Sequence, residues 1–188
     1  MSRHRQAILY LFLLTTICGH RCGIYTDGTL FFYYNPATEK FRRITCYLEE
    51  AYVRVAIAQW DATIVCWRSK YKYNQLRPVT YIRQNIDSTW VPLLTTPPHP
   101  EYPAAHALIT SSIMEAISSV FGPHYSFTDH TYDFRGFPSR SYDSFEAAAN
   151  ECGMSRVYGG IHYKPSVDIG HLYGQLIGKD AAAVQLTK

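Results

Sequence analysis

Basic residues and histidines recur in three short segments that together could bind a phosphate-like anion. Lys70 and Arg77 stand seven residues apart in "KYKYNQLRP", so they share one helix face if the helix continues to Pro78. Arg156 and His162 stand six apart in "SRVYGGIHYKPS", where the two glycines allow a turn that makes both side chains converge. A tetrahedral oxyanion carries two to three charges, and the forked donors of arginine suit it. Taken singly, each pair also fits a solvated basic face or a buried structural imidazole.

The third segment is "PPHPEYPAAHA", residues 97–107. Its prolines restrict themselves and the residues before them, which predicts a stiff extended strut. Pro103 suits the first turn of a helix, whose free backbone N–H groups and partial positive charge favour an anion. The small Ala104 and Ala105 would let an anion approach their amides, with His106 beside it. A histidine that caps its own helix is the simpler alternative.

The two histidines could divide the work of an in-line displacement at the central atom of the anion. One would attack or ligate that atom, and the other would protonate the leaving oxygen on the opposite side. Asp168 follows His162 by six residues, and an aspartate near a histidine commonly orients the ring and fixes its tautomer. The sequence therefore predicts His106, His162 and Asp168 as the catalytic group.

The elements that position these residues are predicted to be helices. A long segment without glycine or proline follows Pro36, and its apolar residues recur at helical intervals. The remaining chain is predicted to form an irregular proline-rich connection (86–103), a second helix (104–122), a polar and aromatic loop (123–140), a third helix (141–156) and a last helix (167–186). The predicted fold class is all-α, a helix bundle with functional loops at one end.

Composition limits the function classes. The 188 residues suffice for one domain, and 47% hydrophobic residues support a packed core. A net charge of only +3 argues against a nucleic-acid partner. No apolar run is long enough for an integral membrane span, which takes about 20 residues.

The N-terminus resembles a targeting segment. "MSRHRQ" is basic and "AILYLFLLTTIC" is apolar, which predicts a signal peptide at 1–18 and a secreted or periplasmic protein. An ordinary N-terminal core helix is the alternative. A short extension, 19–43, and one helical domain, 44–188, complete the predicted organisation. The five cysteines match no zinc or redox spacing, and Cys46 and Cys66 are predicted to be buried free thiols.

The ordered motifs resemble those of the vanadium-dependent haloperoxidases and the type 2 phosphatidic acid phosphatases. The family pattern K-x6-R-P, P-S-G-H and S-R-x5-H stands here as Lys70 to Arg77-Pro78, Pro103-Ala104-Ala105-His106 and Ser155-Arg156 to His162. The resemblance runs from about Trp60 to the C-terminus. It implies the family's α-helical bundle.

The resemblance also implies residue roles. Lys70, Arg77 and Arg156 would clamp the oxyanion, and His106 would be the acid–base histidine. His162 would ligate the vanadium of a vanadate cofactor in a haloperoxidase. In a phosphatase, which needs no cofactor, it would instead attack phosphorus to form a phosphohistidine.

Two further residues favour the haloperoxidase branch. Trp67 and His99 fall where haloperoxidases line the halide side of vanadate, and seaweed bromoperoxidases have a histidine at the place of His99. We therefore expect bromide oxidation by hydrogen peroxide. A soluble exported acid phosphatase acting on phosphate esters is the alternative, whereas a lipid phosphatase would need several membrane spans.

The sequence also departs from the family pattern. Ala104 replaces a serine and Ala105 a glycine, which predicts weaker oxyanion binding because one hydroxyl donor is missing. Asp168 lies six residues after His162, whereas many members place the acid at four. The segment before Lys70 is short, so an inactive anion-binding remnant, or a half that is completed in a homodimer, is a further alternative.

Overall fold

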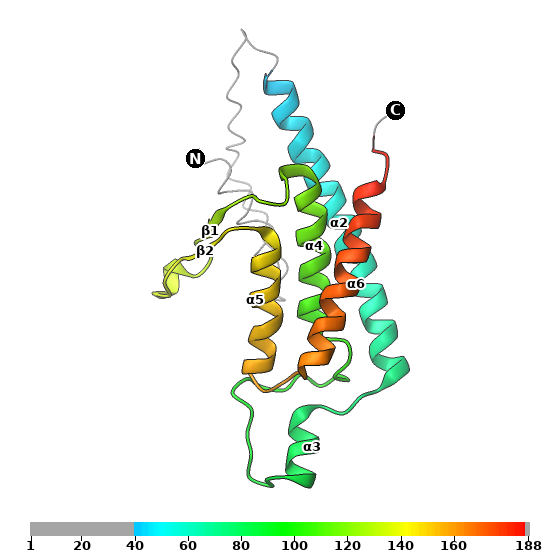
Figure 1. Cartoon of the computed structure of the whole chain (residues 1–188), viewed down its shortest axis with the longest axis vertical. Helices are drawn as coiled ribbons and strands as arrows, with labels where there is room; N and C mark the ends of the chain where they lie inside the picture. The colour runs from blue at the N-terminus through cyan, green and yellow to red at the C-terminus, as the bar shows by residue number, and fades with distance from the viewer. Residues whose placement is uncertain (1–39, 187–188) are drawn as a thin grey trace.

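Four long helices form a bundle in which one of them is central and contacts the other three (Figure 1). The computed structural model describes residues 40–186, with side chains from residue 50 onward. The bundle helices are α2 (Lys40–Tyr73), α4 (Ala105–Phe121), α5 (Phe145–Tyr158) and α6 (Lys164–Ala183), and α4 packs against the other three. This arrangement confirms the predicted all-α bundle. The predicted signal peptide, 1–18, and most of the extension, 19–43, lie outside the described residues.

The core lies between α2, α4 and α5. Its largest cluster joins Val55 of α2, Ile113 and Ile117 of α4, and Phe145 of α5. Buried hydroxyls join the helices as well, since the Ser112 hydroxyl donates to a carbonyl of α2 at 3.0 Å. Burial of these side chains, rather than intrinsic helix propensity, supplies most of the stability of such helices.

Helices α4 and α6 approach unusually closely. A Cβ added to Gly174 of α6 would lie 2.4 Å from the carbonyl oxygen of Leu108 and 2.7 Å from Cβ of Ser111. Only glycine fits at this crossing, because any side chain would meet the backbone of α4. The contact fixes the relative position of the two helices, which both begin at the lower end of the bundle in Figure 1.

A short helix and a short hairpin are present that the sequence did not predict. Helix α3 (Pro78–Asn85) projects below the bundle, and Pro78 begins this helix instead of ending the preceding one. Strands β1 (Phe127–Asp129) and β2 (Arg140–Tyr142) form an antiparallel hairpin around a 3-10 turn, η1 (Asp133–Arg135). Strands of three residues are too short to show the alternation that identifies a strand in a sequence.

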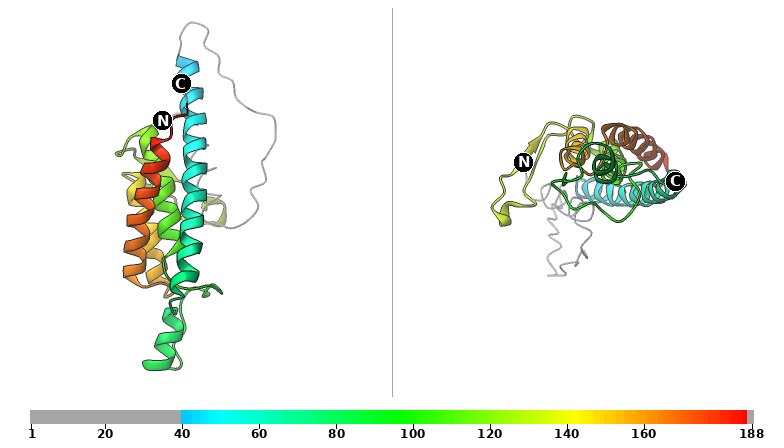
Figure 2. Two further views of the ribbon diagram at one scale, coloured as in Figure 1. Left: turned by 90° about the vertical axis from the view of Figure 1, so that its right-hand side faces the viewer. Right: turned by 90° about the horizontal axis from the view of Figure 1, so that it is seen from below.

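The lower end of the bundle gathers segments that are far apart in the chain. Helices α2 and α5 end there, α4 and α6 begin there, and the segment that leads from α3 into α4 passes beneath them (Figures 1 and 2). The three basic and histidine-containing motifs lie in these segments. Among residues 40–186, no helix is long and apolar enough to cross a membrane.

Candidate active site

Lys70 lies in the last turn of α2 and is completely buried. Its ammonium group donates to the carbonyl oxygens of Pro100, Glu101 and Pro103 at 3.0, 3.0 and 2.7 Å. These bonds fasten the proline-rich strut to the end of α2. Burial lowers the pKa of Lys70 to about 8.

Arg77 does not share a helix with Lys70, contrary to the prediction. Helix α2 ends at Tyr73, and Asn74 follows with a left-handed φ of 45°. Arg77 is extended, with ψ of 152°, because the ring of Pro78 disfavours the helical region for the residue before it. The two cations nevertheless reach the same end of the bundle, since a short connection replaces the predicted helical turn.

The guanidinium of Arg77 connects two histidines. Its Nη1 lies 2.8 Å from the carbonyl oxygen of Ile161 and 3.1 Å from Nε2 of His162, and its Nη2 lies 3.0 Å from Nδ1 of His99. Its Nε donates to the carbonyl oxygen of His99 at 3.0 Å. Arg77 is buried, and these hydrogen bonds join the strut to the loop that follows α5.

His162 is held by Glu101, a residue that the sequence motifs did not indicate. Nδ1 of His162 lies 2.7 Å from Oε1 of Glu101, and both side chains are buried. The carboxylate also accepts from the amide of Tyr163 at 3.0 Å and from the hydroxyl of Ser166 at 2.6 Å. Burial raises the pKa of Glu101, but the hydrogen bonds from His162, Ser166 and Tyr163 together outweigh burial. The pKa of Glu101 therefore lies below its ordinary value.

The contacts of His162 fix its tautomer. Arginine can only donate, so Nε2 of His162 must accept from Arg77. The carboxylate of Glu101 accepts the proton of Nδ1. The lone pair of Nε2 is therefore available for a phosphorus or vanadium atom once a ligand displaces the contact with Arg77.

The predicted orienting role of Asp168 is wrong. Asp168 is exposed on α6 and pairs with Lys164, whose Nζ lies 2.8 and 2.7 Å from its two carboxylate oxygens. The sequence offered one signal for Glu101: it is the only charged residue within the proline strut. Asp168 stood near His162 in the sequence, but Glu101 reaches it from 61 residues away because the strut folds beneath α6.

Arg156 and His162 are brought together by the predicted glycine turn. Gly160 has a left-handed φ of 73°, and the amides of Ile161 and His162 both donate to the carbonyl oxygen of Arg156, at 3.2 and 3.3 Å. The Nε of Arg156 is buried and has no hydrogen-bond partner within the described part of the chain. A buried donor without a partner is rare and suits a bound anion.

His106 lies in the first turn of α4, close to the cations. Burial, together with the charges of Arg156, His162 and Lys70, lowers its pKa to about 4. The imidazole is therefore neutral at pH 7 without a bound anion. The first amides of α4 lack partners within the helix, so they remain available to an anion.

Ala104, which was predicted to present its amide to the anion, uses that amide in a hydrogen bond within the protein. It is the N-cap of α4, without a side-chain cap, and its amide already donates to the carbonyl oxygen of Ser166 at 3.2 Å. Its methyl group is fully buried against Ala107 and Val167. Ala105, the next residue, begins the helix.

Trp67 and His99, the two residues predicted to border the halide, contact each other. Their rings meet edge to face with centroids 4.8 Å apart. Burial lowers the pKa of His99, and the charges of Lys70 and Arg77 act in the same direction. His99 thus favours its neutral form beside the cations.

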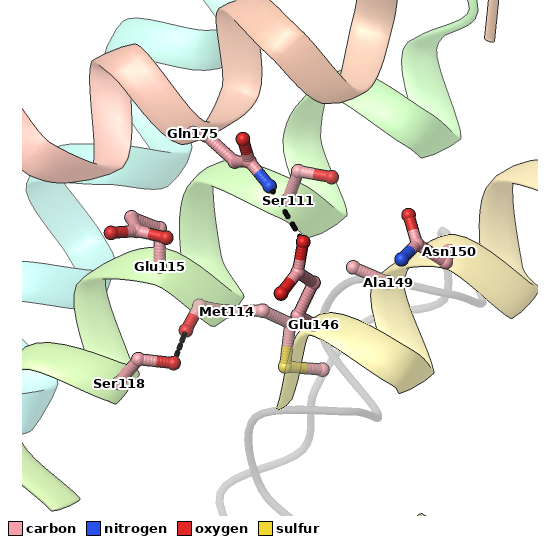
Figure 3. A pocket seen from close by; sticks show the side chains of 8 residues that line it. All are labelled: Ser111, Met114, Glu115, Ser118, Glu146, Ala149, Asn150 and Gln175. Carbon is pink, nitrogen blue, oxygen red and sulfur yellow. Dashed lines mark hydrogen bonds between the residues drawn. The ribbon is translucent and has the colours of Figure 1, made fainter. Parts of the chain in front are cut away.

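A separate recess lies between α4, α5 and α6 (Figure 3). Side chains of all three helices line it, including Ser111, Glu146 and Gln175, and Gln175 donates to Glu146 at 3.2 Å. Its volume of about 10 Å³ admits one water molecule. The recess therefore has no room for a substrate.

The charges around His162 do not cancel within the candidate site. Lys70, Arg77 and Arg156 supply three positive charges, and Glu101 supplies one negative charge. With neutral histidines, an excess of two positive charges remains in a largely buried region. Buried charges require partners, so the residues fit a doubly charged oxyanion such as phosphate or vanadate.

Comparison with known proteins identifies the family of this helical bundle. A family model of the second helical-bundle domain of VCPO matches residues 50–187. The solved structure described as the first bacterial vanadium-dependent iodoperoxidase is 39% identical, with a TM-score of 0.70, over 74% of this chain. A holo-type bacterial vanadium-dependent chloroperoxidase is 23% identical, with a TM-score of 0.60 over 73% of this chain, which shows the fold alone. A search of curated proteins gives no match.

The chain therefore belongs to the vanadium haloperoxidase family, within its second helical-bundle domain. The match covers 35% of the length of each of these two structures.

Proposed function

We propose that the protein is a vanadate-dependent haloperoxidase that oxidises halide, with bromide favoured, using hydrogen peroxide. The observation that carries the proposal is the uncompensated charge of Lys70, Arg77 and Arg156 around the accepting Nε2 of His162. These three cations would hold vanadate, and His162 would ligate its vanadium. Bound vanadate would supply a Lewis-acid centre that activates peroxide.

The surrounding residues would prepare the site for this chemistry. Glu101 keeps the proton of His162 on Nδ1 and thereby leaves Nε2 able to ligate. His106 is neutral near the cations and could accept a proton from peroxide and return it to the leaving oxygen. Trp67 and His99 would border the halide.

An acid phosphatase is the second candidate. The same tautomer leaves Nε2 of His162 able to attack phosphorus, which would form a phosphohistidine, and the same cations suit phosphate. Phosphate and vanadate would then compete for one site. The buried methyl of Ala104 supports a third possibility, an anion-binding remnant without activity.

The test compares two activities in one sample. Purified protein, with and without orthovanadate, is assayed for bromide oxidation by peroxide and for hydrolysis of an aryl phosphate. Iodide is included because one related structure is described as an iodoperoxidase. We expect vanadate-dependent halide oxidation that disappears in His162→Ala but survives in His124→Ala, an exposed histidine outside the site.

The other outcomes select the alternatives. Phosphate hydrolysis that vanadate inhibits, without halide oxidation, would identify a phosphatase. Phosphate binding without either activity would identify a remnant, and halide oxidation retained in His162→Ala would overturn the proposed site. Secretion or periplasmic export remains a proposal, which mass spectrometry of the mature N-terminus would test.

A further inference from the structure

The turn at Gly159 and Gly160 connects Arg156 with His162, and a distant segment of the chain rests on it. Helix α5 ends at Tyr158, immediately before the two glycines. Residues 86–96, which we call the clamp segment, lead from the end of α3 back to the lower end of the bundle (Figure 1). The clamp segment meets the turn there through both backbone and side chains.

The contacts between the clamp segment and the turn are close. The amide of Leu94 donates to the carbonyl oxygen of Gly159 at 3.0 Å. A Cβ added to Gly159 would lie 2.5 Å from Cδ1 of Leu94, and one added to Gly160 would lie 3.0 Å from Cη2 of Trp90. Leu94 and Trp90 therefore rest directly on the backbone of the turn, an approach that glycine permits because it has no side chain.

Local hydrogen bonds fix the position of Trp90. The carboxylate of Asp87 accepts from the amide and the hydroxyl of Thr89, at 2.8 and 2.7 Å, which forms an Asx turn. The amide of Trp90 donates to the carbonyl oxygen of Asp87 at 3.2 Å. Nε of Arg83, in α3, donates to the carbonyl oxygen of Trp90 at 2.8 Å. Helix α3 and the Asx turn thus place Trp90 over the glycines.

Helix α3 contributes little to the bundle itself. It packs against no other helix or strand in the described part of the chain. Residues 78–96, all of which the structure describes, belong to none of the hydrophobic clusters of the bundle. Their contacts with the turn lie at both ends of this stretch, since Arg77 donates to the carbonyl oxygen of Ile161 at 2.8 Å and Leu94 donates to that of Gly159. The contacts therefore concern the candidate site and not the core.

We propose that Trp90 and Leu94 are positioning residues, which hold the glycine turn and thereby keep Arg156 and His162 in the arrangement of the candidate site. The inference deepens the proposed function and rests on it. Two adjacent glycines have the greatest conformational freedom that a chain can have, so an uncovered turn would sample several conformations. The clamp segment removes this freedom before the anion arrives, and an ordered site loses less free energy on binding.

The affinity of the full-length protein for inorganic phosphate, measured by calorimetric titration, is the first test. Trp90→Ala and Leu94→Ala should each lower it about 10-fold, because the turn must then be ordered during binding. Two controls are matched in residue type, namely Trp60→Ala, at a tryptophan of α2 that is 69% exposed, and Leu93→Ala, at the neighbouring leucine that is 84% exposed. Both controls should bind phosphate as the wild type does. Trp90→Phe retains an aromatic ring and should recover part of the affinity.

Gly159→Ala tests the same contact from the other side. Gly159 has a φ of −70°, so alanine introduces no backbone strain, but its methyl group would collide with Leu94. The affinity for phosphate should again fall about 10-fold, because the collision displaces the clamp segment. In the Leu94→Ala background the collision is absent, so adding Gly159→Ala should cost little more. Losses that simply add in the double variant would contradict the contact.

Hydrogen exchange of the anion-free protein tests the clamp without any ligand. The amide of His162 should exchange faster in Trp90→Ala and Leu94→Ala than in the wild type. Amides within α4 and α6 should keep their protection, and the free energy of unfolding should stay unchanged, because the clamp segment is not part of the core. A general loss of protection would instead mean that the variants destabilise the whole bundle, which would overturn the positioning role.

The outcomes separate this inference from the proposed function. Phosphate binding and exchange at His162 that both stay unchanged in Trp90→Ala and Leu94→Ala would show that the turn holds itself, and would overturn the inference. Faster exchange at His162 in a protein that binds no phosphate would reject the oxyanion site and still support the clamp. Faster exchange together with weaker phosphate binding would support both.

Discussion

Oε1 of Glu101 lies 2.7 Å from Nδ1 of His162, and both side chains are buried. The contact crosses 61 residues of sequence and joins the proline strut to the start of α6. It determines which nitrogen of His162 carries the proton. Glu101 is therefore a positioning residue for the nitrogen that we propose as the vanadium ligand.

Replacing Glu101 by glutamine should separate activity from anion binding. The change removes the only negative charge identified in the site, so the affinity for inorganic phosphate should rise. Halide oxidation or phosphate hydrolysis should fall about 10–100-fold, because the tautomer of His162 is no longer enforced. Calorimetric titration with phosphate and steady-state kinetics measure the two effects. Parallel loss of binding and activity would instead indicate a purely structural role.

Anion binding should be accompanied by proton uptake at His106. Its pKa is about 4 in the free protein, where burial and the neighbouring cations oppose its charge. A bound anion neutralises those cations, so the pKa rises and the imidazole takes up as much as about one proton near pH 6. Phosphate titration in buffers of different ionisation enthalpy measures the uptake. His106→Asn should lower it, whereas the exposed His124→Asn should not.

Phosphate affinity should decrease as the pH rises through about 8. Lys70 has a pKa of about 8 in the folded protein and an ordinary value of 10.5, so it loses its charge in this range. Between about pH 8 and pH 10.5 the unfolded chain binds more protons than the folded protein does. The anion-free protein should therefore become more stable as the pH rises through this range. Urea unfolding and phosphate titration at several pH values test both trends. Lys70→Met should remove them, and a trend unchanged in this variant would contradict the assignment.

Ala104→Ser should act in two separable ways. Serine is a preferred N-cap, so the anion-free protein should gain about 0.5–1 kcal/mol in free energy of unfolding. If the hydroxyl also reaches the anion, vanadate should bind more tightly. Urea unfolding without anion and vanadate titration measure the two effects. Greater stability with unchanged vanadate affinity would show that residue 104 does not face the anion.

Gly174→Ala should destabilise the bundle. The new methyl group would lie 2.4 Å from the carbonyl oxygen of Leu108, which forces α4 and α6 apart. The free energy of unfolding should fall by about 1–3 kcal/mol despite the better helix propensity of alanine. Leu176→Ala, at a half-exposed position of the same helix, is the control and should change stability little. Equal losses in both variants would contradict the close-packing explanation.

The sequence was sufficient to predict the bundle, and its motifs selected most residues of the candidate site. The helical runs predicted all four long helices, and the motifs selected Lys70, Arg77, Arg156 and His162, which the structure places at one end of the bundle. Glu101 was missed because its distance from His162 becomes short only after the strut folds beneath α6. Proximity in sequence favoured Asp168, whose true partner is the nearby Lys164.

Helix α2 shows a second limit of sequence patterns. Its apolar residues recur at helical intervals, yet Ala51 and Val55 face the core whereas Trp60, Ile64 and Trp67 lie on the exposed side. Periodicity identifies a helix with apolar residues, but two opposite stripes merge into one pattern when the residues are read in order. Only the packing of the other helices separates them.

The bonds that join Lys70, Arg77, Glu101 and His162 connect positions between 31 and 85 residues apart. Closing such loops is slow, and their contacts give no stabilisation until the intervening helices have docked. The anion site should therefore form late in folding. An anion that recognises only the completed site would then slow unfolding while leaving the folding rate nearly unchanged.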